Sequence, residues 1–83
     1  MTIKKEQIET LTNEETETMK TMMDMNEIKI HSCTILARQL KRYGIASERE
    51  ITRILKTLRA LGRIEVHKDK FTILIPLTEE EMK

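Results

Sequence analysis

The segment from Glu48 to Leu61 constrains the fold of this chain more than any other part of its sequence. Its apolar residues recur at spacings of three and four, which places them along one stripe of an α-helix. This stripe consists of Ile51, Ile54, Leu55, Leu58 and Leu61. At about 100° per residue, the opposite face is basic. That face carries Arg49, Arg53, Lys56 and Ala60, with Thr52 and Arg63 at its edge. Such a helix must pack its apolar stripe on a core and present its basic face to solvent or to a partner.

The ends of this helix are marked by residues with specific backbone roles. Ser47 and Glu50 have the spacing of a capping box, which begins a helix. Gly44 and Gly62 are the only glycines and Pro76 is the only proline. Each should end an element, because glycine accepts the left-handed conformation after a helix and proline cannot donate to a sheet.

The same signals predict two earlier helices. Thr12 and Glu15 form a second capping-box pattern, so a helix is expected from Asn13 to Met25. Another helix is expected over residues 33–43, before Gly44. Between them, Ile28 and Ile30 alternate with polar residues, which predicts a short strand.

Two further strands are expected after Gly62. Ile64 and Val66 alternate with charged or polar residues, and Phe71, Ile73 and Ile75 alternate with Thr72 and Leu74. Residues 67–70 join these two strands as a hairpin with a basic tip. The fold class is therefore α+β and mainly α. The expected order is helix, short strand, helix, amphipathic helix and two-stranded hairpin.

A length of 83 residues allows one domain with short extensions. We assign residues 1–10 to an N-terminal arm, 11–77 to the domain and 78–83 to an acidic tail. Charged residues make up 35% of the chain and apolar ones 39%, a balance that suits a folded, helix-rich domain and not a disordered one. Because so small a domain has a thin core, dimerisation would help to stabilise it.

Several classes of protein are disfavoured by the sequence. It has no apolar stretch of the length of a membrane span and no signal-peptide pattern, so we expect a cytoplasmic protein that does not contact membranes. One cysteine and two histidines are too few for a typical four-ligand zinc site. No nucleophile with an acid and a base and no glycine-rich phosphate loop is present. We expect no enzyme activity, no metal and no cofactor.

The formal net charge of +1 conceals an uneven distribution. Residues 1–27 carry a net charge of −4, residues 28–77 carry +7 and residues 78–83 carry −2. A basic middle between acidic ends indicates an anion-binding surface.

Four stretches of the chain, together with the order of elements, carry a resemblance to a known fold. They are Leu11-Thr12-Asn13-Glu14-Glu15, Ala37-Arg38-Gln39-Leu40, the helix that begins Ser47-Glu48-Arg49-Glu50-Ile51, and Leu61-Gly62-Arg63-Ile64-Glu65-Val66. With these residues the chain resembles winged helix-turn-helix transcriptional regulators over residues 11–78, most closely a stripped-down relative of the multiple-antibiotic-resistance regulator (MarR) type. The resemblance implies a recognition helix over 48–61 and a wing at 67–70. It does not extend to the long dimerisation helices of that family.

The resemblance and the basic face together predict contacts with double-stranded DNA. Arg49 and Arg53 are placed to reach base edges in the major groove, and Lys56 to reach a base or a phosphate. Thr52 would add a hydroxyl or methyl contact, and Ser47 would hold a phosphate at the start of the helix. The remaining predicted contacts are Arg63 and, on the backbone or in the minor groove, the wing residues Lys68 and Lys70.

A homodimer is the expected assembly, because repressors of this fold place two recognition helices about one turn of DNA apart. We predict that its interface consists of Ile8, Leu11, Met19, Met22, Met23 and Met25. The methionines would provide deformable packing at the core or at this interface, and the alternative interpretation is a soft-metal or ligand site.

Three other interpretations remain open at this point. The pair His31 and Cys33, with His67, would allow a metal sensor, although such scattered residues are more often structural. The same fold also serves as a protein-interaction module in replication, transcription or segregation complexes. A DNA-binding accessory factor of replication or plasmid maintenance shares the prediction of DNA contact.

Overall fold

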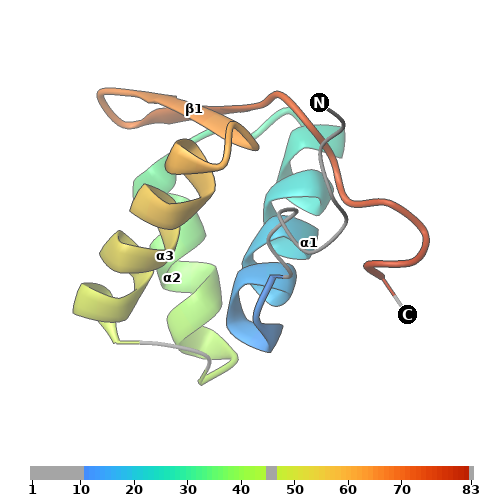
Figure 1. Ribbon diagram of the computed structural model, residues 1–83. Coiled ribbons are helices and arrows are strands. Elements are labelled where there is room, and N and C mark those ends of the chain that lie inside the picture. The colour runs from blue at the N-terminus through green and yellow to red at the C-terminus, as the bar shows by residue number, and fades with distance from the viewer. Residues whose placement is uncertain (1–10, 45–46, 83) are drawn as a thin grey trace.

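The computed structural model describes residues 11–44 and 47–82 of the chain. Within these residues it contains three helices and one two-stranded antiparallel sheet (Figure 1). In order, these are α1 (Asn13–Glu27), α2 (Cys33–Arg42), α3 (Glu48–Ala60), β1 (Ile64–His67) and β2 (Lys70–Ile73). The predicted class, mainly helical α+β, is confirmed, and the arrangement is compatible with a winged-helix-like fold.

The three helices begin at side-chain caps, as the sequence pattern indicates. The Thr12 hydroxyl accepts a hydrogen bond from the Glu15 N–H at 3.1 Å, and the Glu15 carboxylate accepts one from the Thr12 N–H at 2.9 Å. This is the predicted capping box. Ser32 caps α2, and Ser47 caps α3 by accepting from the Glu50 N–H at 3.4 Å. The predicted capping box of Ser47 with Glu50 is only half formed, because the Glu50 carboxylate does not accept from the Ser47 N–H in return. Each cap satisfies a backbone donor that the first helical turn leaves free.

The helices end where a residue adopts the left-handed conformation. Gly44 follows α2 with φ of 68° and Gly62 follows α3 with φ of 76°, as expected for glycines at these positions. Helix α1 ends in the same way at Lys29, whose φ is 66°. There the Ile30 N–H donates to the Met25 carbonyl at 2.8 Å, which closes the turn.

One hydrophobic core joins all the elements. Helix α1 lies beside α2 and α3, and the hairpin crosses the end of the helices at which α2 begins and α3 ends (Figure 1). The buried apolar side chains are Met19, Met22, Met25, Leu36, Leu40, Ile51, Ile54, Leu58, Ile64, Phe71 and Leu77. The inner stripe of α3 is thus fixed in the core, and the basic side of this helix must face outward.

The hairpin has the predicted position and a two-residue turn. Its register pairs Ile64 with Ile73 and His67 with Lys70, so that Lys68 and Asp69 form the turn. Strand β2 ends at Ile73, two residues before the predicted end of that strand. The N–H groups of the next two residues both donate to the Arg63 carbonyl, at 2.8 and 3.0 Å.

The strand predicted around Ile28 and Ile30 is wrong. Helix α1 continues to Glu27, Ile28 forms its C-cap, and the residues up to Ile30 complete the left-handed turn. The segment that precedes α2 forms no strand with the hairpin, but one isolated β-bridge, between Ser32 and Lys70. Ile28 is 66% exposed, so its side chain does not pack inward as a strand residue would.

Candidate nucleic-acid interface

The outer face of α3 carries the basic side chains predicted to bind DNA. Arg49, Arg53 and Lys56 are exposed, and none of them forms an ion pair with another described residue. Thr52 is exposed on the same side, and its hydroxyl donates to the Glu48 carbonyl at 3.1 Å. The face therefore offers three cationic donors that no carboxylate of the described chain occupies.

The start of α3 is more acidic than its middle. Glu48 and Glu50 lie in the first turn, where they interact favourably with the helix dipole. The Ser47 hydroxyl oxygen already accepts a hydrogen bond from a backbone N–H. The hydroxyl could therefore bind a phosphate only by donating its own proton to a phosphate oxygen. The predicted phosphate contact of Ser47 stays a prediction.

The carboxyl group of Glu50 on α3 interacts with that of Glu14 on α1. Hydrogen bonding between the two carboxyl groups, followed by the charge of Glu50, raises the pKa of Glu14, and the positive charge of Arg53 opposes this rise. This arrangement leaves Arg53 outside the ion pairs of the described residues, although Glu50 lies three positions before it.

The hairpin turn presents two lysines. Lys68 is exposed and has φ of 58°, a conformation that costs most residues other than glycine and asparagine strain energy. Lys70 is exposed at the start of β2. Residues that keep such strained conformations are often found at functional sites.

Between these lysines, Asp69 ties the hairpin to α2. Its carboxylate accepts hydrogen bonds from the Ser32 hydroxyl at 2.6 Å, the Thr34 hydroxyl at 2.7 Å and the Thr34 N–H at 3.0 Å. Its backbone carbonyl accepts the Cys33 N–H at 2.6 Å. The Ser32 bond, followed by the Thr34 bond, lowers the pKa of Asp69. No local sequence pattern indicates this role of Asp69, because nothing near it in the chain links it to a helix that begins 36 positions earlier.

Arg63, a predicted DNA contact, is instead engaged within its own chain. Its guanidinium forms a bidentate ion pair with Glu81 and also donates to the Pro76 carbonyl at 3.3 Å. The Arg63 side chain is only 12% exposed. The Arg63 guanidinium lowers the pKa of Glu81. Arg63 therefore holds the C-terminal segment against the base of the hairpin, and Glu81 is not a freely solvated tail residue.

The predicted dimer interface divides into buried and partly buried residues. Met19 and Met22 are 0% exposed and Met25 is 4% exposed, all within the core of one chain. This corrects the prediction for these three, because a side chain enclosed by its own chain has no surface to offer a partner. Leu11 and Met23 are partly buried against the core. Ile8 lies outside the described residues.

Two of the residues considered for a metal site, His31 and Cys33, are partly buried beside the hairpin. Nε2 of His31 is buried without a hydrogen-bond partner, and its ring meets the Phe71 ring edge-on at 6.0 Å. Burial, and then the charge of Asp69, raises the pKa of the Cys33 thiol. Over residues 11–44 and 47–82, no three His, Cys, Asp or Glu side chains come together in a way that could hold a metal ion.

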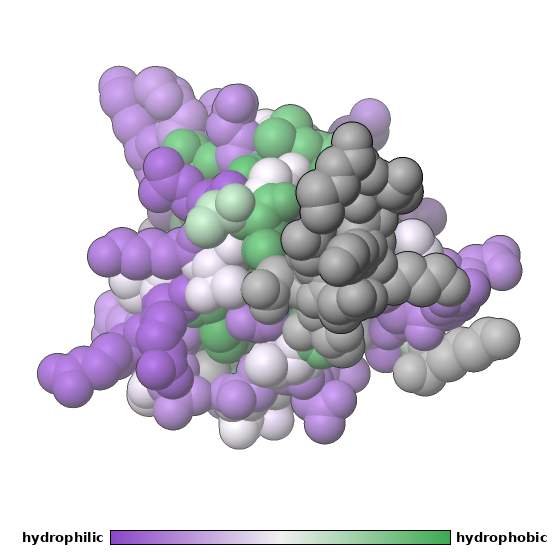
Figure 2. Space-filling model, viewed as in Figure 1, coloured by the Kyte–Doolittle hydropathy of each residue, from purple (hydrophilic) through white to green (hydrophobic). Residues whose placement is uncertain are grey.

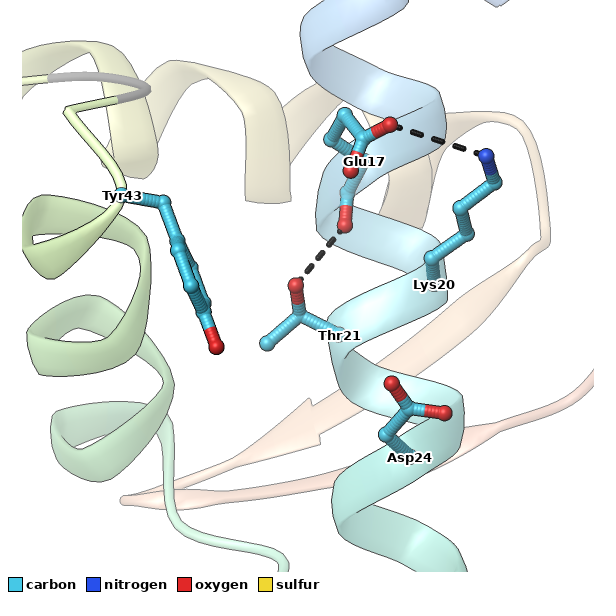
Figure 3. Close-up of a pocket in the computed structure, with 5 residues that line it drawn as sticks. All are labelled: Glu17, Lys20, Thr21, Asp24 and Tyr43. Atoms are coloured by element: carbon cyan, nitrogen blue, oxygen red, sulfur yellow. Dashed lines mark hydrogen bonds and ion pairs between the residues drawn. The ribbon is translucent and has the colours of Figure 1, made fainter.

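A depression of about 430 Å³ lies between α1 and the end of α2 (Figure 3). It is lined by Glu17, Lys20, Thr21, Asp24 and Tyr43. Within it, Glu17 and Lys20 form an ion pair at 3.6 Å, and the Thr21 hydroxyl donates to the Glu17 carbonyl. The two charged groups nearest each other, Glu17 and Lys20, thus pair within the depression and leave little net charge there to orient a ligand. We therefore place the candidate site on the basic face of α3.

Comparisons with protein-family models, curated proteins and solved structures found no match to this chain. In the described part of the chain, no helix has the length and apolar character needed to cross a membrane. The fold class and the geometry of the basic face are therefore the grounds on which a function can be argued.

Proposed function

We propose that this chain is a sequence-specific double-stranded DNA-binding protein of the winged helix-turn-helix type. It acts as a transcriptional regulator, most simply as a repressor that occludes a promoter, and has no enzyme activity. The observation that carries this proposal is the outer face of α3, where Arg49, Arg53 and Lys56 are exposed and outside the ion pairs of the described residues.

The geometry of α3 suits the major groove. A single α-helix fits this groove, where base edges can be distinguished, and arginine pairs with guanine through two hydrogen bonds. Arg49 and Arg53 are four residues apart, so they lie one above the other on the helix. Like charges at this spacing cost a few tenths of a kcal/mol, a cost that a polyanionic partner would relieve.

A gel shift on a duplex selected from a random pool tests the proposal. We expect each of Arg49→Ala and Arg53→Ala to lower affinity for the selected duplex by about 5- to 150-fold and to relax its sequence preference. The matched control is the double variant Lys20→Ala with Lys29→Ala, which removes two positive charges from α1 and the turn that follows it. If the arginine variants keep both affinity and sequence preference, α3 is not the recognition helix.

A homodimer on a palindromic site remains part of this proposal. The predicted interface residues that are left after the correction above are Ile8, Leu11 and Met23. Stoichiometry of the complex on the selected duplex checks the dimer, because a dimer places two chains on two half-sites about one helical turn apart.

One observation favours the alternative of a protein-interaction module. Leu74 and Ile75 follow β2 with exposed fractions of 53% and 50%, and adjacent apolar side chains of this kind can contact a partner protein. Salt dependence separates the two functions. A DNA-binding dimer that neutralises six or more phosphates loses roughly a thousandfold in affinity between 50 and 200 mM salt. An interaction module would show little DNA affinity at either salt concentration.

A further inference from the structure

The outer face of α2 is a second basic surface that the sequence analysis did not single out. Leu36 and Leu40 are buried on the inner face, and the opposite side presents Thr34, Arg38 and Arg42, all exposed and four residues apart. Helix α2 contains no Asp or Glu. Neither arginine forms an ion pair with another described residue.

The hairpin turn adjoins one end of this face. Thr34, the first residue of the stripe, donates two hydrogen bonds to Asp69. Lys68 and Lys70 flank Asp69 in the chain, so the turn brings two further exposed cations to the start of α2. The hydrogen bonds to Asp69 thus hold the hairpin turn against the start of α2, where the turn extends the α2 surface.

The start of α3 adjoins the other end of this α2 face. The Lys41 ammonium of α2 pairs with the Glu48 carboxylate of α3 at 3.4 Å, an exposed contact. Figure 1 shows α2 and α3 side by side, and in Figure 2 long hydrophilic side chains project from the side of the molecule on which α2, α3 and the hairpin lie. Because Glu48 neutralises Lys41, the free charge of the α2 face lies on Arg38 and Arg42.

The start of α2 itself is already occupied. The N-terminus of a helix commonly binds phosphate through its free N–H groups. In this chain the Thr34 N–H donates to Asp69, and the negative charge of that carboxylate would repel a phosphate. An anion approaching α2 would therefore meet its side chains and not its helix end.

We propose that Arg38 and Arg42 bind the phosphate backbone of the duplex that α3 reads, beside the hairpin lysines Lys68 and Lys70, for which a backbone contact is already predicted. This inference rests on the proposed DNA-binding function. The contacts are electrostatic, so they contribute affinity and salt dependence without contributing sequence preference. The i, i+4 repulsion between Arg38 and Arg42 is relieved when phosphates lie between them.

The test is the slope of log affinity against log salt concentration for the selected duplex and for a scrambled one. Each phosphate contact contributes about 0.9 to the magnitude of this slope. We expect Arg38→Ala and Arg42→Ala each to reduce the magnitude by about that amount, with equal losses of affinity on both duplexes. Arg38→Lys should retain the slope, and the control Lys20→Ala should leave it at the wild-type value.

The outcomes separate this inference from the proposed function. If wild type binds the selected duplex while Arg38→Ala and Arg42→Ala keep its slope, the α2 contacts are overturned and the role of α3 stands. If wild type shows no salt-dependent binding to any duplex, both proposals fall. Circular dichroism of each variant establishes that the altered slopes come from folded protein.

Discussion

Asp69 gives Thr34 the carboxylate acceptor that α2 lacks in its own first turn. The Thr34 N–H and hydroxyl donate to the same oxygen of Asp69 at 3.0 and 2.7 Å, across 35 positions of sequence. A negative group at this place satisfies a free backbone donor and interacts favourably with the helix dipole. One residue of the hairpin turn thus caps α2 and fixes the two neighbouring lysines of the turn beside it.

The Asp69 contact predicts a specific acid sensitivity. The pKa of Asp69 is lower in the folded chain than in the unfolded chain, chiefly because of the Ser32 hydroxyl. Its stabilising effect is therefore complete above the unfolded pKa and is lost as the pH falls through the folded pKa. We expect the free energy of unfolding of wild type to fall more steeply than that of Asp69→Asn below about pH 4. Urea unfolding at several pH values checks this, and parallel pH profiles would contradict it.

The ion pair of Arg63 with Glu81 predicts a structural role for both residues. The two side chains are only 12% and 22% exposed, so solvent screens their interaction weakly. We expect Glu81→Gln to lower the free energy of unfolding by about 1–2 kcal/mol. Arg63→Lys should also destabilise, because lysine cannot form the two parallel bonds.

Measurements of DNA binding distinguish the structural role of Arg63 and Glu81 from the DNA contact that the sequence predicted for Arg63. Glu81→Gln should leave the salt slope of binding at its wild-type value. If Arg63→Ala weakened DNA binding without lowering stability, Arg63 would belong to the interface after all.

The left-handed residue after α1 predicts a stabilising substitution. Lys29 has φ of 66°, a conformation that costs about 1–2 kcal/mol for a residue with a Cβ atom. Glycine removes this strain but loses about 0.5–1 kcal/mol through the freedom of the unfolded chain. Lys29→Gly should therefore raise the free energy of unfolding by about 0.5–1 kcal/mol. Lys29→Ala is the matched control, since it keeps the strain, and an equal gain in both variants would exclude the backbone explanation.

The burial of the methionines predicts how stability depends on protein concentration. Met22 is 0% exposed within one chain, so Met22→Ala should lower the free energy of unfolding by about 2–5 kcal/mol, and Met22→Leu by less than about 1.5 kcal/mol. Because the lost contacts lie within one chain, the loss should be the same at micromolar and at tenfold higher concentration. A wild-type midpoint that rose with concentration, while that of Met22→Ala did not, would place Met22 at an interface between chains.

Features with local causes could be predicted from the sequence. The capping box of Thr12 with Glu15 and the left-handed Gly44 and Gly62 each depend on residues within one helical turn, and the structure has them where the pattern indicates. The apolar stripe of α3 likewise predicted which of its sides faces the core. The prediction of a strand around Ile28 was wrong, because two alternating apolar residues are too weak a pattern to show that the preceding helix has ended.

The remaining features depend on contacts between distant residues. The Asp69 cap of α2 and the ion pair of Arg63 with Glu81 join residues that are 35 and 18 positions apart, and no spacing rule connects them. For the same reason, a methionine stripe such as that of Met19 and Met22 looks alike whether it meets its own core or a second chain. The exposure of the basic face of α3 could therefore be predicted from its own residues, whereas the engagement of Arg63 with Glu81 could not. The role of this face in DNA binding stays a prediction.

The most direct test of the account is selection of bound duplexes from a random pool by the wild-type chain, followed by competition between the selected and a scrambled duplex. We expect a palindromic sequence to be enriched and bound roughly a thousandfold or more tightly than the scrambled duplex. That ratio should collapse when Arg49 and Arg53 are both replaced by Ala. A pool that shows no enrichment, with equal affinity for both duplexes, would contradict sequence-specific DNA recognition by α3.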